Sequence, residues 1–220
     1  MVNFLELLLL AVLLRVPCAI ILLNSAVNPS LFVLHPALNA IAFQLCFPLG
    51  IYVMQESKSV MDFKTRELLS KLHMFFQVVA MLLLSLGGAA AYMTKNAFGK
   101  EHFTSTHSWL AAGTATLATL SLLGTTWQWK KSGHRIGGIL AFSSGGCSVI
   151  YGVYSGSWGI SQLGENLQFM VSCSVSAAYS LLIAKTDGET NHHPVHQERL
   201  KDLVYGFGQL SHHAGIVFKE

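Results

Sequence analysis

Six separate apolar stretches, each about 20 residues long, constrain this chain more than any other feature of its sequence. They cover residues 4–23, 35–54, 72–93, 107–127, 136–154 and 163–184. A helix of about 20 apolar residues can cross the hydrocarbon core of a bilayer, and the connections between these stretches are short and polar. The sequence therefore predicts an all-α, six-span transmembrane bundle over residues 1–185. A polar, His-containing tail over residues 186–220 follows it.

Charged side chains are scarce in the chain. Only 11% of the 220 residues are Asp, Glu, Lys or Arg, whereas soluble domains carry about 25%. A charge at the centre of a bilayer costs several kcal/mol, so the deficit indicates that lipid is the solvent. The net charge is +3 and no basic stripe is interleaved with aromatic residues, so no nucleic acid is expected as a partner.

Lysine and arginine are distributed unevenly between the connections, and this predicts the orientation in the membrane. Seven lie in the second and fourth connections, whereas the third holds two, and the first and fifth hold none. The seven are Lys58, Lys64, Arg66, Lys71, Lys130, Lys131 and Arg135, and the two are Lys95 and Lys100. The second and fourth connections and both termini are therefore predicted to be cytoplasmic. The expected location is the endoplasmic reticulum, another endomembrane vesicle or the plasma membrane.

Arg15 is the one charge near the middle of a predicted span. Tilt of the helix, with the side chain reaching toward an interface, is the favoured interpretation. A partner inside the bundle, such as a cofactor carboxylate, is the alternative.

Four of the ten histidines occur at or just before the amino end of a predicted span. Because successive spans alternate in direction, His35 and His107 are expected near the non-cytoplasmic surface, and His73 and His134 near the cytoplasmic surface. Each pair comes from two parallel helices. Ionisable side chains inside a membrane are functional candidates, and neutral imidazole binds iron, zinc or copper.

The number of ligands in each pair distinguishes between these metals. Zinc takes four protein ligands, or three and a water molecule, and no buried Asp, Glu or Cys is expected to complete either pair. Two imidazoles instead fill both axial positions of a haem iron, which leaves no open site for oxygen or substrate and favours electron transfer. Any single histidine at a helix end is more simply a capping or interfacial residue, but four at matching depths favour a cofactor.

Short motifs surround the four histidines. Residues 106–110 read Thr-His-Ser-Trp-Leu, His35 is followed by Pro36, Lys71 precedes His73 by two residues, and residues 134–137 read His-Arg-Ile-Gly. In this order the motifs resemble those of the cytochrome b561 family, over residues 1–185, and the short chain is similar to its small stand-alone subgroup. The interval of 27 residues from His107 to His134 is shorter than is usual for the family, so donor contacts from that connection are in doubt.

The resemblance implies a trans-membrane, ascorbate-dependent ferrireductase or monodehydroascorbate reductase with two haem b groups. His35 and His107 would bind the non-cytoplasmic haem iron, and His73 and His134 the cytoplasmic one. Ascorbate is the implied cytoplasmic donor, ferric iron or monodehydroascorbate the acceptor on the other side, and a homodimer is left open.

Positive side chains near the cytoplasmic pair are candidates for holding the ascorbate anion, since focused positive charge concentrates anions. They are Lys71, Lys130, Lys131 and Arg135. The alternative is that these cations only set the orientation. On the other side, His102, with Lys95 and Lys100, is a candidate for the acceptor end.

Two other functions use the same histidines. One is a haem-binding membrane scaffold or sensor, and the other is a divalent-metal carrier. A reduced-minus-oxidised optical spectrum separates them, because only haem gives a low-spin b-type band.

Overall fold

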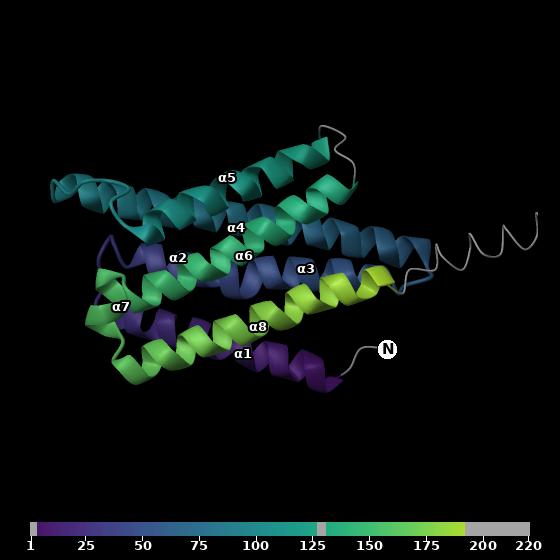
Figure 1. Cartoon of the computed structure of the whole chain (residues 1–220), viewed down its shortest axis with the longest axis horizontal. Helices are drawn as coiled ribbons and strands as arrows, with labels where there is room; N and C mark the ends of the chain where they lie inside the picture. Colours follow the sequence, from purple (N-terminus) through teal and green to yellow (C-terminus); the bar gives the residue numbers. More distant parts are fainter. Residues whose placement is uncertain (1–3, 127–130, 192–220) are drawn as a thin grey trace, which may run out of the picture. The chain divides into compact units, whose positions relative to one another are not determined.

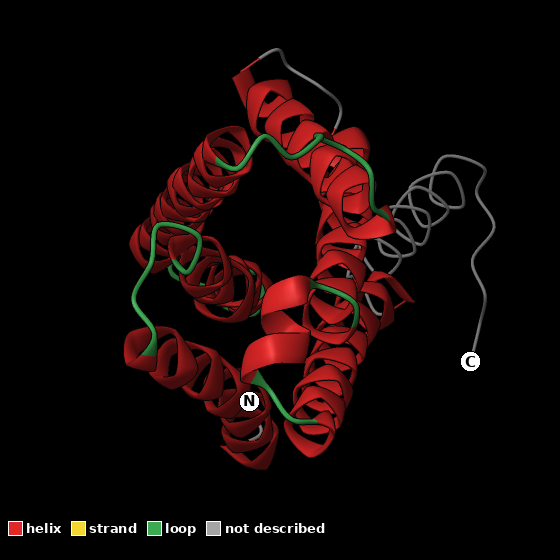
Figure 2. Ribbon diagram, turned by 90° about the vertical axis from the view of Figure 1, so that its left-hand side faces the viewer, coloured by secondary structure: helices red, strands yellow, loops and turns green. Residues whose placement is uncertain are grey.

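The computed structural model describes residues 4–126 and 131–191, and every regular element in these ranges is helical (Figures 1 and 2). The chain divides into two units, Met1–Ile183 and Ala184–Glu220, and the contacts below lie within the first. The predicted tail from residue 186 stays a prediction, and its histidines lie outside the described residues. The elements are α1 (Phe4–Val27), α2 (Leu34–Ile41), η1 (Ala42–Cys46), α3 (Phe47–Ser57), α4 (Phe63–Ala97), α5 (Thr106–Thr126), α6 (Lys131–Tyr154), α7 (Ser157–Gln162) and α8 (Glu165–Asn191).

Five helical segments among the described residues have the length and composition of a membrane span. They are Leu5–Val27, Leu34–Ser57, Phe63–Ala97, Gly133–Tyr154 and Glu165–Lys185. Each coincides with one of the predicted stretches, so the prediction of an all-α transmembrane bundle is confirmed. The second segment comprises α2, η1 and α3 together.

Helix α5 lies where the remaining span was predicted, but it is not among the five. It contains no Asp, Glu, Lys or Arg, and its hydropathy is lowered because six of its 21 residues are Thr. Three of these hydroxyls have described hydrogen bonds within the protein. Thr116 and Thr119 donate to the Ala112 and Ala115 carbonyls at 2.9 and 2.7 Å. The Thr114 hydroxyl lies 2.8 Å from that of Ser144 on α6. Such a helix can enter lipid, and a sixth crossing by α5 stays a prediction.

A π-helical segment, η1, interrupts the second span between α2 and α3. The Phe47 N–H reaches back five residues to the Ala42 carbonyl. Pro48 has no N–H, so in the same register the Phe43 carbonyl loses its backbone donor. The buried Tyr179 hydroxyl of α8 supplies the missing hydrogen bond, at 2.7 Å from that carbonyl oxygen. The segment inserts one extra residue into the helix.

Helix α4 begins earlier than the third predicted span. Its N-cap, Asp62, accepts hydrogen bonds from the Thr65 N–H at 2.8 Å and the Thr65 hydroxyl at 2.6 Å. These bonds lower the pKa of the Asp62 carboxyl, the hydroxyl contributing most. Lys64 and Lys71 therefore lie on a helix that extends beyond the apolar stretch, where the sequence had predicted a loop.

Helix α1 packs against α2 and η1 through a stripe of buried residues, namely Leu10, Leu14, Cys18 and Ile21. Arg15 is exposed on another face of this helix. A side chain on that face does not enter the bundle, which favours the interpretation that it reaches along the helix toward an interface.

Helix α6 approaches its neighbours closely at two adjacent glycines. A Cβ atom on Gly145 would overlap the Phe43 ring of η1, and one on Gly146 would lie 2.6 Å from Cδ1 of Tyr179. The Phe142 and Tyr179 rings stack with centroids 3.9 Å apart. Helix α6 thus contacts both η1 and α8, and it runs beside α5 along its length (Figure 1).

Candidate functional site

His35 and His107 lie at the amino ends of α2 and α5, and their rings lie close together, nearly at right angles. The ring centroids are 5.8 Å apart and the ring planes are inclined by 84°. No group of three or more His, Cys, Asp or Glu residues that could hold a metal occurs among the described residues. Within the described part of the chain, this pair therefore offers two imidazoles and no third ligand of those types.

His73 and His134 form a second pair with almost the same geometry. Their ring centroids are 6.3 Å apart and the planes are inclined by 89°. His73 lies on α4 and His134 in the first turn of α6. The structure thus brings together the two pairs that the sequence predicted, while their role as haem ligands stays a prediction.

Each of the four rings is oriented by a backbone carbonyl of the antiparallel neighbour helix. The Nδ1 atoms of His35, His73, His107 and His134 lie 3.0, 2.8, 2.9 and 3.0 Å from the carbonyl oxygens of Gly87, Gly50, Ser148 and Ser121, respectively. A carbonyl oxygen can only accept, so Nδ1 donates its N–H in each case. This fixes the tautomer that leaves the Nε2 lone pair free for a metal.

The spacing between paired rings fits a shared metal. A metal–imidazole bond of about 2.0 Å on each side, with about 1 Å from each nitrogen to its ring centre, places the two centroids about 6 Å apart. The observed 5.8 and 6.3 Å agree with this value. In each pair the two imidazoles are therefore spaced so that they could hold one iron between them, as the histidine ligands of a haem would.

Three of the four carbonyls lie at the same sequence interval from the histidine of their own span, and the fourth differs by one residue. His73 and Gly87, His107 and Ser121, and His134 and Ser148 are each 14 residues apart, which is a rise of about 21 Å. His35 and Gly50 are 15 residues apart, and the extra residue is the one that η1 inserts. Each of these four spans thus carries a histidine near one end and, near its other end, the carbonyl that accepts a hydrogen bond from a histidine of its neighbour.

Glycines give the rings room at both levels. A Cβ atom on Gly152 of α6 would lie 2.9 Å from Cε1 of His107, and one on Gly137 would lie 2.6 Å from Oγ of Ser121, whose carbonyl supports His134. By contrast, a Cβ atom on Gly88 or Gly138 would meet nothing within 4 Å. Only some of the glycines in these helices are therefore required by close packing at the site.

Side chains add contacts at the His35–His107 pair. The amide of Asn39, one turn after His35, lies with Nδ2 3.1 Å from the His35 Nδ1 atom. The hydroxyl of Ser148 lies 3.4 Å from the His107 Nδ1 atom. For His73 and His134, the described part of the chain shows one carbonyl contact to each Nδ1 and no side-chain contact.

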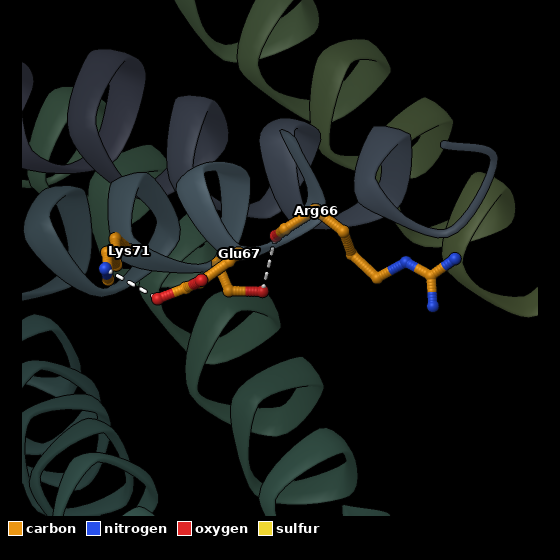
Figure 3. A network of polar contacts seen from close by, with 4 residues as sticks. Arg66, Glu67 and Lys71 are labelled. Carbon is orange, nitrogen blue, oxygen red and sulfur yellow. Dashed lines mark hydrogen bonds and ion pairs between the residues drawn. The ribbon is translucent and has the colours of Figure 1, made fainter. Parts of the chain in front are cut away.

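Lys71, a predicted ascorbate residue, is paired with an acidic neighbour. Its Nζ lies 2.7 Å from Oε1 of Glu67, one turn earlier on α4, and both side chains are exposed (Figure 3). Glu67 was not singled out in the sequence, although an acidic residue four positions before a lysine on a helix is a recognisable pair. The positive charge that Lys71 offers an anion is therefore partly neutralised.

The other predicted substrate residues are placed to different extents. Lys130 lies outside the described residues, and Lys131 begins α6 without a described side chain. Arg135 is half-buried in the first turn of α6, next to His134. His102 stacks on Tyr92 with centroids 4.4 Å apart, and its Nε2 lies 2.8 Å from Oδ1 of Asn96. The Lys95 ammonium donates to the Glu101 carbonyl at 2.9 Å, whereas Lys100 is exposed.

Several groups at the site have no signal in the sequence. Backbone carbonyls carry no residue signature, so those of Gly50, Gly87, Ser121 and Ser148 were not predicted. Asn39 was also missed, although its position four residues after His35 places it on the same helix face.

The chain is similar to a known protein family and to two named proteins. The eukaryotic cytochrome b561 family matches residues 34–159, more than half of the chain. Proteins of Homo sapiens and Mus musculus, each named probable transmembrane reductase CYB561D1, are 32% and 33% identical over 99 residues. These matches cover 45% of this chain and 40% of each relative, so they span less than half of the relatives' length.

Proposed function

The chain belongs to the eukaryotic cytochrome b561 family of haem b-binding transmembrane oxidoreductases, and we propose that it carries electrons across its membrane from ascorbate. The acceptor in this proposal is ferric iron or monodehydroascorbate on the opposite side. Two haem b groups are held, one by His35 and His107 and the other by His73 and His134. The observation that carries the proposal is the pair of matching His–His geometries, at 5.8 and 6.3 Å, about 21 Å apart along the helices.

Bound haem would supply one-electron redox chemistry, and with both axial positions filled it would have no open site for oxygen. The contribution of the chain is to hold the four imidazoles in the Nδ1–H tautomer through four carbonyls. Such partners orient metal-binding histidines and raise the basicity of the other ring nitrogen. The carbonyls belong to helices, so they cannot reorient without breaking helical geometry.

The two sides of the membrane have different roles in this proposal. In this proposal the His73–His134 end and both termini face the cytoplasm. Lys64, Arg66 and Lys71 lie on α4 near that end, and cations favour the cytoplasmic side of a membrane. Ascorbate is a monoanion at neutral pH, and it loses one electron and one proton to become monodehydroascorbate. Lys71, Lys130, Lys131 and Arg135 would attract that anion, and His102 at the other end would face the acceptor. The α5 helix completes six crossings, and the membrane is an endomembrane or the plasma membrane.

The experiment that tests the proposal uses purified protein reconstituted in liposomes with a ferric chelate inside. Ascorbate added outside should produce a low-spin b-type band in the reduced-minus-oxidised spectrum and then ferrous iron inside, which a trapped ferrous indicator reports. His102→Ala is the control for haem content, since that histidine lies outside both pairs. Absence of the band would favour a divalent-metal carrier. A band that ascorbate cannot produce, but dithionite can, would favour a haem-binding scaffold or sensor.

A further inference from the structure

His35 on α2 and His73 on α4 are each followed, one helical turn later, by a residue with an amide side chain. Asn39 follows His35 by four residues, and Gln77 follows His73 by four. Each amide lies against the glycine whose carbonyl supports the histidine. A Cβ atom on Gly87 would lie 3.0 Å from Nδ2 of Asn39, and a Cβ atom on Gly50 would overlap Nε2 of Gln77. The two sites therefore have the same local plan.

The contacts of the two amides differ, and Gln77 is one methylene longer than Asn39. The Asn39 amide lies 3.1 Å from Nδ1 of His35. The Gln77 amide nitrogen is buried and has no hydrogen-bond partner among the described residues, and no contact with His73 Nδ1 is described. Among the described contacts, the His35 ring alone therefore receives a side-chain amide at Nδ1.

The donor and acceptor roles of the neighbouring atoms decide whether the oxygen or the nitrogen of the Asn39 amide faces the ring. The Gly87 carbonyl, 3.0 Å from His35 Nδ1, can only accept, so Nδ1 carries the proton and any second partner must also accept. The oxygen and nitrogen of an amide are interchangeable in shape and are assigned from such networks. The present Oδ1 position is buried and has no partner in the described part of the chain, so turning the amide breaks no described hydrogen bond there.

We propose that Asn39 is a positioning residue for His35, with its amide oxygen accepting a second hydrogen bond from Nδ1–H. The amide then holds the ring in the tautomer that leaves Nε2 free, and it makes that ring a more basic ligand than His73. A more basic axial ligand stabilises ferric over ferrous iron, so Asn39 lowers the reduction potential at the His35–His107 site. The two sites differ in potential partly for this reason.

This inference rests on the proposed function, because it requires haem at the His35–His107 pair. The test therefore uses the His73→Ala background, in which the haem between His35 and His107 is read alone. Asn39→Leu keeps the size of the side chain and removes the acceptor, and Asn39→Asp keeps the size and offers a stronger acceptor. Redox titration followed by optical spectroscopy gives the midpoint potential of each variant.

The expected result is a rise in midpoint potential for Asn39→Leu and a fall for Asn39→Asp, each with haem retained. The matched control is Gln77→Leu in the His35→Ala background, which should leave the potential of the His73–His134 haem unchanged. Unchanged potentials in both Asn39 variants, with haem bound, would overturn the inference and leave the proposed function standing. If Asn39→Leu does not fold, the direction of the Asn39→Asp shift decides. Loss of haem from the His73→Ala protein itself would count against both.

Discussion

At the His35–His107 end of the bundle each ring meets a side chain as well as a carbonyl, whereas at the His73–His134 end the described contacts of each Nδ1 are a carbonyl alone. The backbone plan is otherwise the same at both ends, with carbonyl contacts between 2.8 and 3.0 Å. Repeated backbone geometry therefore sets the distance between paired rings. The side chains around that geometry are what can make the two sites chemically different.

The surfaces beyond the two pairs differ as well. Near His107, aromatic rings of α4, α5 and the connection between them lie close together: Tyr92 stacks on His102, and the Phe103 and Trp109 centroids are 5.7 Å apart. Near His73, the extension of α4 is charged and carries the exposed Lys71–Glu67 pair (Figure 3). The charged end attracts an anion only to the extent that its positive side chains are not neutralised by acidic neighbours.

The largest expected effect comes from removing one ligand at either end. His35→Ala or His107→Ala should remove one haem and spare the other, and His73→Ala or His134→Ala should do the reverse, because axial coordination at each iron needs both imidazoles. Haem-to-protein stoichiometry and the low-spin spectrum measure this. A His35→Ala protein that keeps two fully low-spin haems would show that the pairing is wrong.

A smaller effect is expected from the π-helical segment. Deleting Gln44 removes the extra residue of η1 and rotates α3 by about 100° relative to α2, so the Gly50 carbonyl no longer faces His73. Occupancy of the His73–His134 site should fall severalfold. Gln44→Leu is the control. It keeps the register and removes a buried amide without partners, so it should keep both haems. Equal haem content in the two variants would mean that the 15-residue spacing is unimportant.

Gly152→Ala should weaken the His35–His107 site selectively. The new Cβ would lie 2.9 Å from His107 Cε1, and overpacking of this kind costs about 1–3 kcal/mol. Haem affinity at this site should fall by about tenfold, since 1.4 kcal/mol is a factor of ten. Haem titration of the apoprotein measures it, in the His73→Ala background. Gly88→Ala, where a Cβ meets nothing within 4 Å, should bind haem normally, and a similar loss there would point to a general effect on the helices.

The smallest expected effect is on the charged surface at the His73–His134 end. Lys71→Ala should slow reduction by ascorbate by at most about fivefold, because an exposed cation contributes about 1 kcal/mol or less. Glu67→Gln should speed reduction, since it releases Lys71 from its ion pair. Stopped-flow rates at low and high salt measure both changes, and salt should reduce them because exposed charges are screened over about 8 Å at physiological ionic strength. Rates that do not respond to either substitution would leave these residues only a role in orientation.

Much of the fold follows from the long apolar stretches that are visible in the sequence. Five of the six predicted spans coincide with helices that can cross a membrane, because span length depends on the thickness of lipid and not on the neighbours of the helix. The start of α4 at Phe63 was missed, since an Asp62 cap can begin a helix in water ahead of the apolar stretch. Helix α5 is long enough to cross a membrane but rich in threonine, so hydropathy alone does not decide whether it is a span.

The sequence by itself determined which histidines belong together, because alternating spans place the amino ends of parallel helices on the same side. It did not determine how the rings are held. The four carbonyls, the extra residue in η1 and the approach of Asn39 to His35 depend on which turn of one helix lies opposite which turn of another. That register is set by packing at glycines such as Gly50 and Gly87, where the neighbouring side chain leaves little or no room for a Cβ. Only the tertiary structure therefore shows how the contacts of two sites, each built on a pair of histidines, differ.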